Sequence, residues 1–143
     1  MRPSNKLLHP TFLYIGAAKA GSSWIFEALY DHPEIFVPIA KDIRYFENYY
    51  TQHDFSWYLK QFSEATSDHK AIGEVSHDYF INEVYADRIK EHLPDVKLIA
   101  CLREPTSLME SAYNYGLIHD KAQTISQEHF IVNSVAAQHI AYL

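Results

Sequence analysis

The sequence predicts an α/β protein in which a central parallel sheet lies between two layers of helices, a three-layer α/β/α fold. Two observations predict it. Short apolar runs at residues 12–15, 35–37, 71–74 and 96–102 alternate with segments of helical periodicity. A loop bounded by glycines joins the first run to the first helical segment. Ligands in such folds bind beyond the carboxyl ends of the strands, so we expect the functional residues in the turns that follow them.

The first strand, loop and helix form the stretch around which we expect the site to be built. Residues 12–15 are apolar with aromatic and β-branched members, as in a buried parallel strand. Gly16 and Gly21 bound a loop that holds Lys19, and helical spacing of apolar residues begins at Ser22. A helix N-terminus presents unpaired N–H groups and the positive end of the helix dipole. The stretch therefore predicts an anion site, to which the lysine adds a full charge.

This loop differs from the loop of nucleoside-triphosphate-binding proteins. Their motif is G-x-x-x-x-G-K-[ST], with the lysine directly after the second glycine. In this chain Ser22 occupies that position, and the lysine lies two residues before Gly21. The usual arrangement of a hydroxyl on Mg²⁺ is therefore not predicted, and we expect no metal at the site.

The segment after the first helix is the first with two interpretations. Pro33 blocks continuation of the helix, and residues 35–37 form a short second strand. Residues 40–50 then mix charged and aromatic side chains. Such a mixture fits the wall of a substrate site, and it fits equally an amphipathic surface segment docked by its aromatic residues.

The remaining elements follow from periodicity and from turn residues. We expect a helix capped by Asp54 and ending at Phe62, a loop at 63–70, a strand at 71–74, a helix at 82–93, a strand at 96–102, a helix from Pro105 to about Gly116, a loop at 118–124 and a last helical stretch from Ser126. The run at 96–102 is the clearest buried strand, and Arg103 stands at its carboxyl end. Arg103, Lys19 and Glu74 are thus predicted to lie at one edge of the sheet.

The composition indicates one soluble domain over residues 1–143. The length suffices for a core, and 48% hydrophobic with 21% charged residues is ordinary for a soluble protein. The net charge of −6 argues against a nucleic-acid partner. No signal-peptide pattern and no run of 18 apolar residues occurs, so we expect no membrane segment and a cytoplasmic protein. Cys101 is the only cysteine, which excludes an internal disulfide and predicts a buried, inert thiol.

A second motif begins at Arg103. An arginine at a strand end projects a planar fork of donors that suits a phosphate. Ser111 lies about two turns into the following helix and can assist only if that helix runs back past the same pocket. Taken alone, the two residues describe equally well an arginine at a sheet edge and a serine on a helix surface.

Together the two motifs resemble those of the sulfotransferases that use 3′-phosphoadenosine 5′-phosphosulfate (PAPS). The order G-x-x-K-x-G-[ST]-[ST] resembles the loop that binds the 5′-phosphosulfate. The family's 3′-phosphate motif, R-x-P-x-x-R-x-x-S-x-Y, is matched here except at Leu108, where many members carry arginine. The matching positions are Arg103, Pro105, Ser111 and Tyr113.

Two segments between the motifs are similar to the heparan-type branch of that family. K-D-I-R-Y-F at residues 41–46 is similar to K-E-x-x-x-F, and G-E-V-S-H-D-Y-F at residues 73–80 to E-K-[ST]-P-x-Y-F. Val75 replaces the lysine of the second pattern. The similarity covers residues 12–116. Family members continue well beyond this length, so we expect the C-terminal part of the family fold to be missing.

The resemblance implies a P-loop NTPase-like sulfotransferase fold and transfer of a sulfuryl group from PAPS to an acceptor hydroxyl or amine. Transfer of the sulfuryl group converts PAPS into 3′-phosphoadenosine 5′-phosphate (PAP). The donor-binding residues that it implies are Gly16, Lys19, Ala20, Gly21, Ser22, Ser23, Trp24, Arg103 and Ser111.

The same resemblance implies the catalytic residues. Lys19 would stabilise charge on the leaving phosphate. Asp42 matches the catalytic glutamate of the heparan-type branch and is the first choice as base, with Glu74 and His77 as alternatives. The acidic balance and the many aromatic residues favour a small organic acceptor, without nucleic acid or membrane as partner.

Two other functional classes stay open on the sequence alone. One is a P-loop kinase or NTPase, against which the missing G-K-[ST] sequence and the lack of an acidic Mg²⁺ ligand at a strand end argue. The other is a truncated, non-catalytic module that binds a nucleotide or a protein partner.

Overall fold

The computed structural model describes residues 8–119. The chain divides into two compact units, residues 1–102 and residues 103–143. The first unit holds strands β1 (Phe12–Gly16), β2 (Ile35–Phe36), β3 (Ala71–Val75) and β4 (Lys97–Ala100), helices α1 (Ser22–Tyr30), α2 (Phe55–Lys60) and α3 (Glu83–His92), a π-helical turn η1 (Tyr45–Tyr49) and a 3₁₀ turn η2 (Tyr79–Ile81). The described part of the second unit is helix α4 (Pro105–His119).

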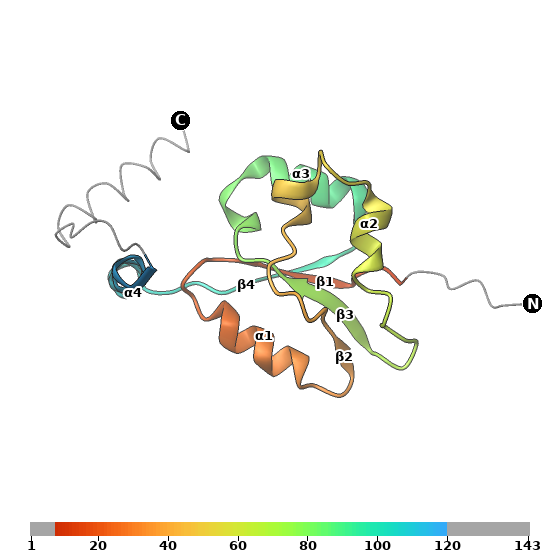
Figure 1. The fold of residues 1–143 in the computed structure, drawn as a ribbon, viewed down its shortest axis with the longest axis horizontal. Helices are drawn as coiled ribbons and strands as arrows, with labels where there is room; N and C mark the ends of the chain where they lie inside the picture. The colour runs from red at the N-terminus through yellow and green to blue at the C-terminus, as the bar shows by residue number, and fades with distance from the viewer. Residues whose placement is uncertain (1–7, 120–143) are drawn as a thin grey trace, which may run out of the picture. The chain divides into compact units, whose positions relative to one another are not determined.

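The four strands form one parallel sheet in the order β2-β3-β1-β4. Leu13 of β1 is level with Glu74 of β3 and with Leu98 of β4. The segment after β1 forms α1 on one face of the sheet, whereas the segment after β3 forms α3 on the other face (Figure 1). The connections therefore diverge to opposite faces at the carboxyl ends of β1 and β3, a switch point at which α/β proteins bind ligands.

Two hydrophobic cores lie on the two faces of the sheet, because successive side chains of a strand point to opposite sides. On the α1 face, Phe12 and Tyr14 pack with Phe26, Val37 and Val75. On the other face lies a larger core, which we call the aromatic core because five of its eleven buried members are aromatic, and it is built from β1, β3, η1, α2, η2, α3 and residues beside them. Its buried members are Leu13, Ile43, Tyr45, Phe46, Tyr58, Leu59, Phe62, Ile72, Tyr79, Ile89 and Leu93. The predicted three-layer α/β/α fold is thus confirmed for residues 8–102.

The charged and aromatic segment at residues 40–50 is docked by its aromatic residues, as one of its two interpretations predicts. Tyr45 and Phe46 are buried, and the ring of Tyr45 stacks on Tyr58 with centroids 4.9 Å apart. Arg88 of α3 donates a 2.7 Å hydrogen bond to the carbonyl oxygen of Phe46. These contacts fix the backbone of the segment, and with it the positions from which the charged side chains before η1 extend.

Several boundaries and burial states differ from the sequence prediction. The run at 96–102 is the clearest buried strand by sequence, but β4 is exposed along its length because it has a single neighbour, β1, at the edge of the sheet. Cys101 is half-buried rather than buried. α2 ends at Lys60 instead of Phe62, and α4 continues past Gly116, so that Ile118 is helical and not part of a loop. The helix expected from Ser126 lies outside the described residues.

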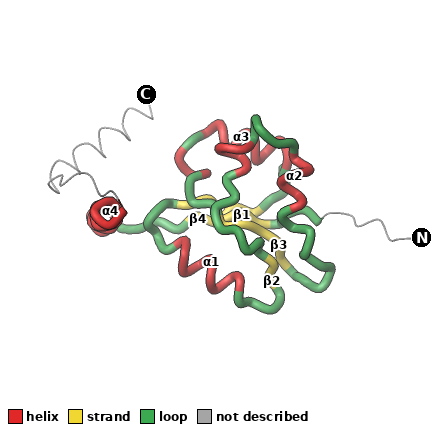
Figure 2. Tube along the Cα trace, viewed as in Figure 1, coloured by secondary structure: helices red, strands yellow, loops and turns green. Residues whose placement is uncertain are grey.

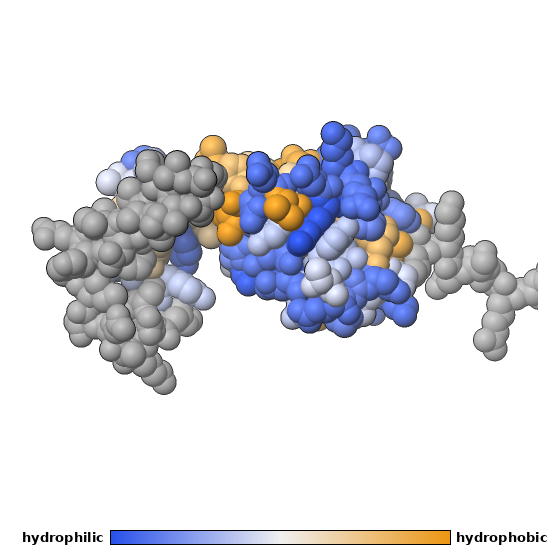
Figure 3. Space-filling view, turned by 90° about the horizontal axis from the view of Figure 1, so that it is seen from above, coloured by the Kyte–Doolittle hydropathy of each residue, from blue (hydrophilic) through white to orange (hydrophobic). Residues whose placement is uncertain are grey.

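The face of the described residues seen in Figure 3 is mainly hydrophilic. Seen from the side of α2 and α3, hydrophobic residues gather in a few separate patches (Figure 3). No helix among residues 8–119 is both long enough and apolar enough to cross a bilayer.

Gly73 provides a test of how closely β1 and β3 approach each other. A Cβ atom at this position would lie 2.5 Å from the carbonyl oxygen of Phe12 and 2.6 Å from two carbons of its ring. We therefore expect Gly73→Ala to lower the free energy of unfolding by about 1–3 kcal/mol, as overpacking of a core does. Denaturant unfolding of the purified chain measures this, and an unchanged midpoint would contradict the packing described here.

Candidate functional site

The loop after β1 is fixed in place by backbone contacts. Gly16 has a φ of +136°, and a Cβ atom on it would collide with the carbonyl oxygen of His77. Only glycine therefore lets the loop pack directly against the segment that follows β3. The carbonyl oxygen of Gly16 accepts a 2.7 Å hydrogen bond from the N–H of Cys101, and the N–H of Ala17 donates to the carbonyl oxygen of Cys101 at 2.8 Å.

The loop leads into α1 in a geometry that suits an anion. Lys19 adopts φ 60° and Gly21 φ 89°, and α1 begins at Ser22. The first N–H groups of a helix have no partner within the helix, and Gly21 has no side chain that could cap them. Ser22 is buried, whereas Ser23 and the indole of Trp24 are exposed. The loop thus combines a helix N-terminus with a half-buried lysine, an arrangement that attracts phosphate or sulfate groups.

The segments that follow β2 and β3 are tied to each other beside this loop. Both are loops in Figure 2. The N–H of Asp42 donates a 2.9 Å hydrogen bond to the carbonyl oxygen of Val75, and the N–H of Arg44 donates to Oγ of Ser76 at 3.2 Å. Asp42 and Arg44 both have positive φ angles, 59° and 54°. Residues other than glycine rarely adopt this conformation, which costs on the order of 1 kcal/mol and is concentrated at functional sites.

Five charged or titratable side chains of these two segments form what we call the Asp42–His77 cluster: Lys41, Asp42, Arg44, His77 and Asp78. Nδ1 of His77 lies 2.7 Å from Oδ1 of Asp42, and Nζ of Lys41 lies 3.1 Å from Oδ2. The backbone N–H of His77 also donates to Oδ1, at 3.3 Å. On the far side of the imidazole, Nε2 lies 3.4 Å from Oδ1 of Asp78, whose other oxygen is paired with Arg44.

Asp42 remains ionised in this cluster. Burial alone would raise the pKa of its carboxyl group, but the hydrogen bonds from His77 and Lys41 outweigh burial and lower the pKa from 3.8 to about 2. Both carboxylate oxygens are occupied by these partners. Asp42 is therefore better suited to holding His77 than to taking up a proton itself.

Glu74 lies in the interior instead of the opening of the site. It is 1% exposed and points into the aromatic core. Burial raises the pKa of its carboxyl group to about 7, against the opposing effect of the hydroxyls of Tyr79, Ser76 and Tyr58. None of the described groups makes a hydrogen bond of good geometry to either oxygen. Because the protein already encloses Glu74 completely, the position favours a structural role over contact with an acceptor.

The second motif lies in the second unit. Arg103 is exposed and is followed directly by the start of α4, on which Ser111 is half-buried. The carboxylate of Glu104 accepts hydrogen bonds from the N–H groups of Thr106, at 3.0 Å, and Ser107, at 2.8 Å, and so caps this helix. Because Lys19 and Arg103 belong to different units, their meeting at one site stays a prediction.

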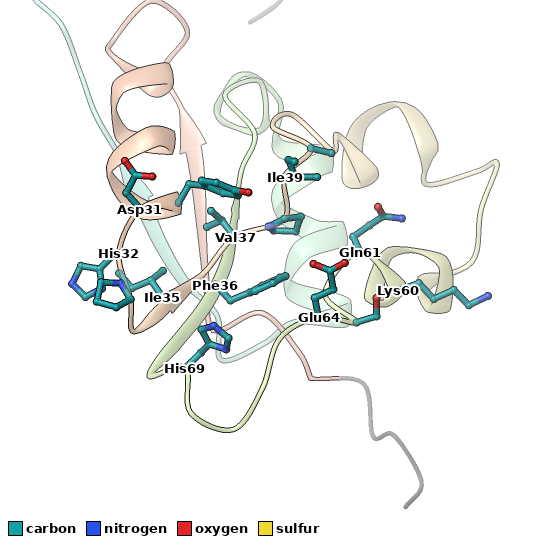
Figure 4. A pocket seen from close by; sticks show the side chains of 15 residues that line it. Asp31, His32, Ile35, Phe36, Val37, Ile39, Lys60, Gln61, Glu64 and His69 are labelled. Atoms are coloured by element: carbon teal, nitrogen blue, oxygen red, sulfur yellow. The ribbon is translucent and has the colours of Figure 1, made fainter. Parts of the chain in front are cut away.

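A cavity of about 570 Å³ adjoins the segment that leads to Asp42 (Figure 4). It lies between the end of α1, β2 and the end of α2, with Phe36 and His69 among its lining residues. Pro38, Ile39 and Ala40 line it as well, and they come directly before Lys41. The cavity is open to a ligand of the size of one sugar or aromatic ring.

The sequence identified Asp42 and His77 separately but not as a pair, and it missed Arg44 and Asp78. The sequence signal that could have identified Arg44 and Asp78 is their position in the turns that follow β2 and β3. Because β2 and β3 are neighbours in the sheet, the turns that follow them meet. Within residues 8–119 no group of three His, Cys, Asp or Glu side chains is placed to hold a metal ion.

Comparison with known proteins finds similar sequences among sulfotransferases. The membrane-associated sulfotransferase kil1 of Dictyostelium discoideum is 36% identical over 110 residues, which are 76% of this chain and 23% of kil1. Heparan sulfate glucosamine 3-O-sulfotransferase 5 of Mus musculus is 32% identical over 111 residues, 76% of this chain and 31% of the mouse protein. This chain thus spans less than a third of the length of these curated relatives. No protein-family model matches it.

A solved structure shares the fold. The crystal structure of a sulfotransferase from Alicyclobacillus acidocaldarius superimposes with a TM-score of 0.73 and 30% sequence identity, over 85% of this chain and 55% of the bacterial one. Sequence and fold therefore point to the same group of proteins.

The charge state of Asp42 predicts a pH-dependent stability. A carboxyl group whose pKa is lowered in the folded state stabilises the protein above its ordinary pKa, and this contribution is lost as the pH falls through the lowered value. With pKa values of 3.8 and about 2, Asp42 contributes about 2 kcal/mol at neutral pH. Asp42→Asn should therefore lower the free energy of unfolding at pH 7, with a difference from wild type that shrinks between pH 4 and pH 2. Asp87→Asn, on the exposed face of α3, is the control. A difference that stays constant down to pH 2 would contradict this charge state.

Proposed function

Since the chain belongs to the sulfotransferase family, we propose that it binds PAPS and transfers the sulfuryl group to a hydroxyl or amine of an acceptor. The observation that supports this most is the position of the loop. The segment that holds Lys19 and opens α1 packs, through Gly16, against the backbone of His77. A loop suited to an anion therefore lies beside the Asp42–His77 cluster, which supports a site for sulfuryl transfer at this edge of the sheet.

Sulfuryl transfer, like phosphoryl transfer, requires mainly positioning and stabilisation of charge. Negative charge grows on the phosphate oxygen as the bond to sulfur breaks. The N–H groups from Ala20 to Trp24, together with the hydroxyls of Ser22 and Ser23, would bind the 5′-phosphosulfate. Lys19 would neutralise the growing charge from a backbone position that the loop fixes in advance.

The second motif completes the donor site in this proposal. Arg103 offers a planar fork of donors to the 3′-phosphate, and Ser111 one hydroxyl. Contacts far from the reacting atoms would fix the donor and distinguish PAPS from nucleotides without a 3′-phosphate. The cap that Glu104 forms supports this by holding the start of α4 directly after the arginine.

The acceptor is proposed to be a small organic compound that carries a hydroxyl or amine. The cavity of about 570 Å³ lined by Pro38, Ile39 and Ala40 has room for a ligand of that size, and Lys19, Asp42 and His77 are not among its lining residues. The name of the mouse relative states that it acts on glucosamine in heparan sulfate, so an amino sugar is the first compound to try. The net charge of −6 argues against a long polyanion. A cytoplasmic location stays a prediction.

Lys19→Ala tests the proposed function. Loss of one preorganised charge typically raises a barrier by about 3 kcal/mol, so we expect turnover of PAPS to fall about a hundredfold, with the unfolding midpoint unchanged. Transfer of ³⁵S-labelled sulfate to a panel of amino sugars and phenols measures this, with Lys90→Ala, an exposed lysine of α3, as the control. Near wild-type turnover in the Lys19 variant would remove this residue from the mechanism.

A further inference from the structure

We propose that His77, oriented by Asp42, is the base that takes the proton from the acceptor. The inference rests on the proposed function, and it divides the work between two residues that the sequence offers as alternatives. His77 touches the acceptor, and Asp42 acts through His77 as a positioning residue.

The contacts of Asp42 exclude it as the group that meets the acceptor. Its Oδ1 accepts from Nδ1 and from the backbone N–H of His77, and its Oδ2 is paired with Lys41. Its left-handed backbone conformation is held by the hydrogen bond to Val75. The carboxylate is thus fixed toward the imidazole, as in other sites where a carboxylate orients a histidine base.

The imidazole itself is placed to meet a substrate. Because the carboxylate of Asp42 accepts a hydrogen bond from Nδ1, a neutral His77 keeps its proton on Nδ1. The lone pair of the ring is then on Nε2. Oδ1 of Asp78 lies 3.4 Å from Nε2, a distance at which it can pair with the imidazolium but gives no proton to the neutral ring, and its other oxygen is held by Arg44. The side chain is 22% exposed, and its backbone lies against Gly16 at the start of the Lys19 loop. His77 therefore reaches the surface next to the site proposed for the sulfuryl group.

The other carboxylate candidate does not reach that surface. Glu74, on β3, is enclosed by the aromatic core, and both of its carboxylate oxygens are buried. Asp42 and His77 are equally exposed, 23% and 22%, but both oxygens of Asp42 are already paired, so Nε2 of His77 is the acceptor that this geometry favours.

The acceptor oxygen forms a bond to sulfur while its proton passes to Nε2 of His77. The bond between sulfur and the bridging oxygen of PAPS breaks, and its electron pair stays on the phosphate of PAP, next to Lys19. The imidazolium that results is stabilised by Asp42, and it returns its proton to water after the products leave.

Imidazole ¹⁵N NMR of the labelled chain tests the pairing without any need for turnover. The chain has nine histidines, and the spectrum of His77→Gln assigns the signal. We expect neutral His77 to carry its proton on Nδ1, and we expect this preference to disappear in Asp42→Asn and to return in Asp42→Glu. A proton on Nε2 in the neutral form, or an imidazolium that persists to pH 9, would overturn the proposal.

Kinetics then test the role of the pair. His77→Gln should lower kcat by about 10²–10⁴-fold, with the affinity for PAP within twofold of wild type. Asp42→Asn should lower kcat less, with the same unchanged affinity. His53→Gln, an exposed histidine that stacks on Trp57, is the matched control. Wild-type kcat in His77→Gln would overturn the proposal, whereas a wild-type chain that neither binds PAP nor transfers sulfate would defeat the proposed function and leave the NMR result to decide the pairing.

Discussion

The contact between Gly16 and the backbone of His77 is the constraint on which the site depends. It brings the end of β1 so close to the segment after β3 that no side chain fits between them. The loop that holds Lys19 and the Asp42–His77 cluster are therefore neighbours. A larger residue at position 16 would separate the two, because its Cβ atom would displace either the loop or the backbone of His77.

The sheet and the aromatic core of the first unit hold these two segments in place. The parallel order β2-β3-β1-β4 puts the carboxyl ends of β1, β2 and β3 at the same edge, so three turns that are distant in sequence become neighbours. The aromatic core beneath η1 fixes the segment that carries Lys41, Asp42 and Arg44. Burial of apolar surface thus stabilises the strained backbone of Asp42 and Arg44, which would not persist in an isolated peptide.

Local patterns allowed much of this to be predicted from sequence. The β1 strand, the glycine loop and α1 follow from residues that are adjacent along the chain, and so does the cap of Asp54 on α2. The pairing of Asp42 with His77 joins residues 35 positions apart, and no periodicity reveals it. β4 shows the opposite failure, because an apolar run predicts burial but cannot tell an edge strand from a central one. Whether Arg103 meets Lys19 depends on the arrangement of two units and remains a prediction.

A titration of the wild-type chain with PAP and with ATP–Mg²⁺ tests the central claim most directly, namely that the loop after β1 binds a phosphosulfate nucleotide. Calorimetry should show PAP binding at least tenfold more tightly than ATP–Mg²⁺, with an affinity that does not change when EDTA is added. Tight binding of ATP that requires Mg²⁺, together with no measurable binding of PAP, would contradict the account and would assign the loop to a kinase or NTPase.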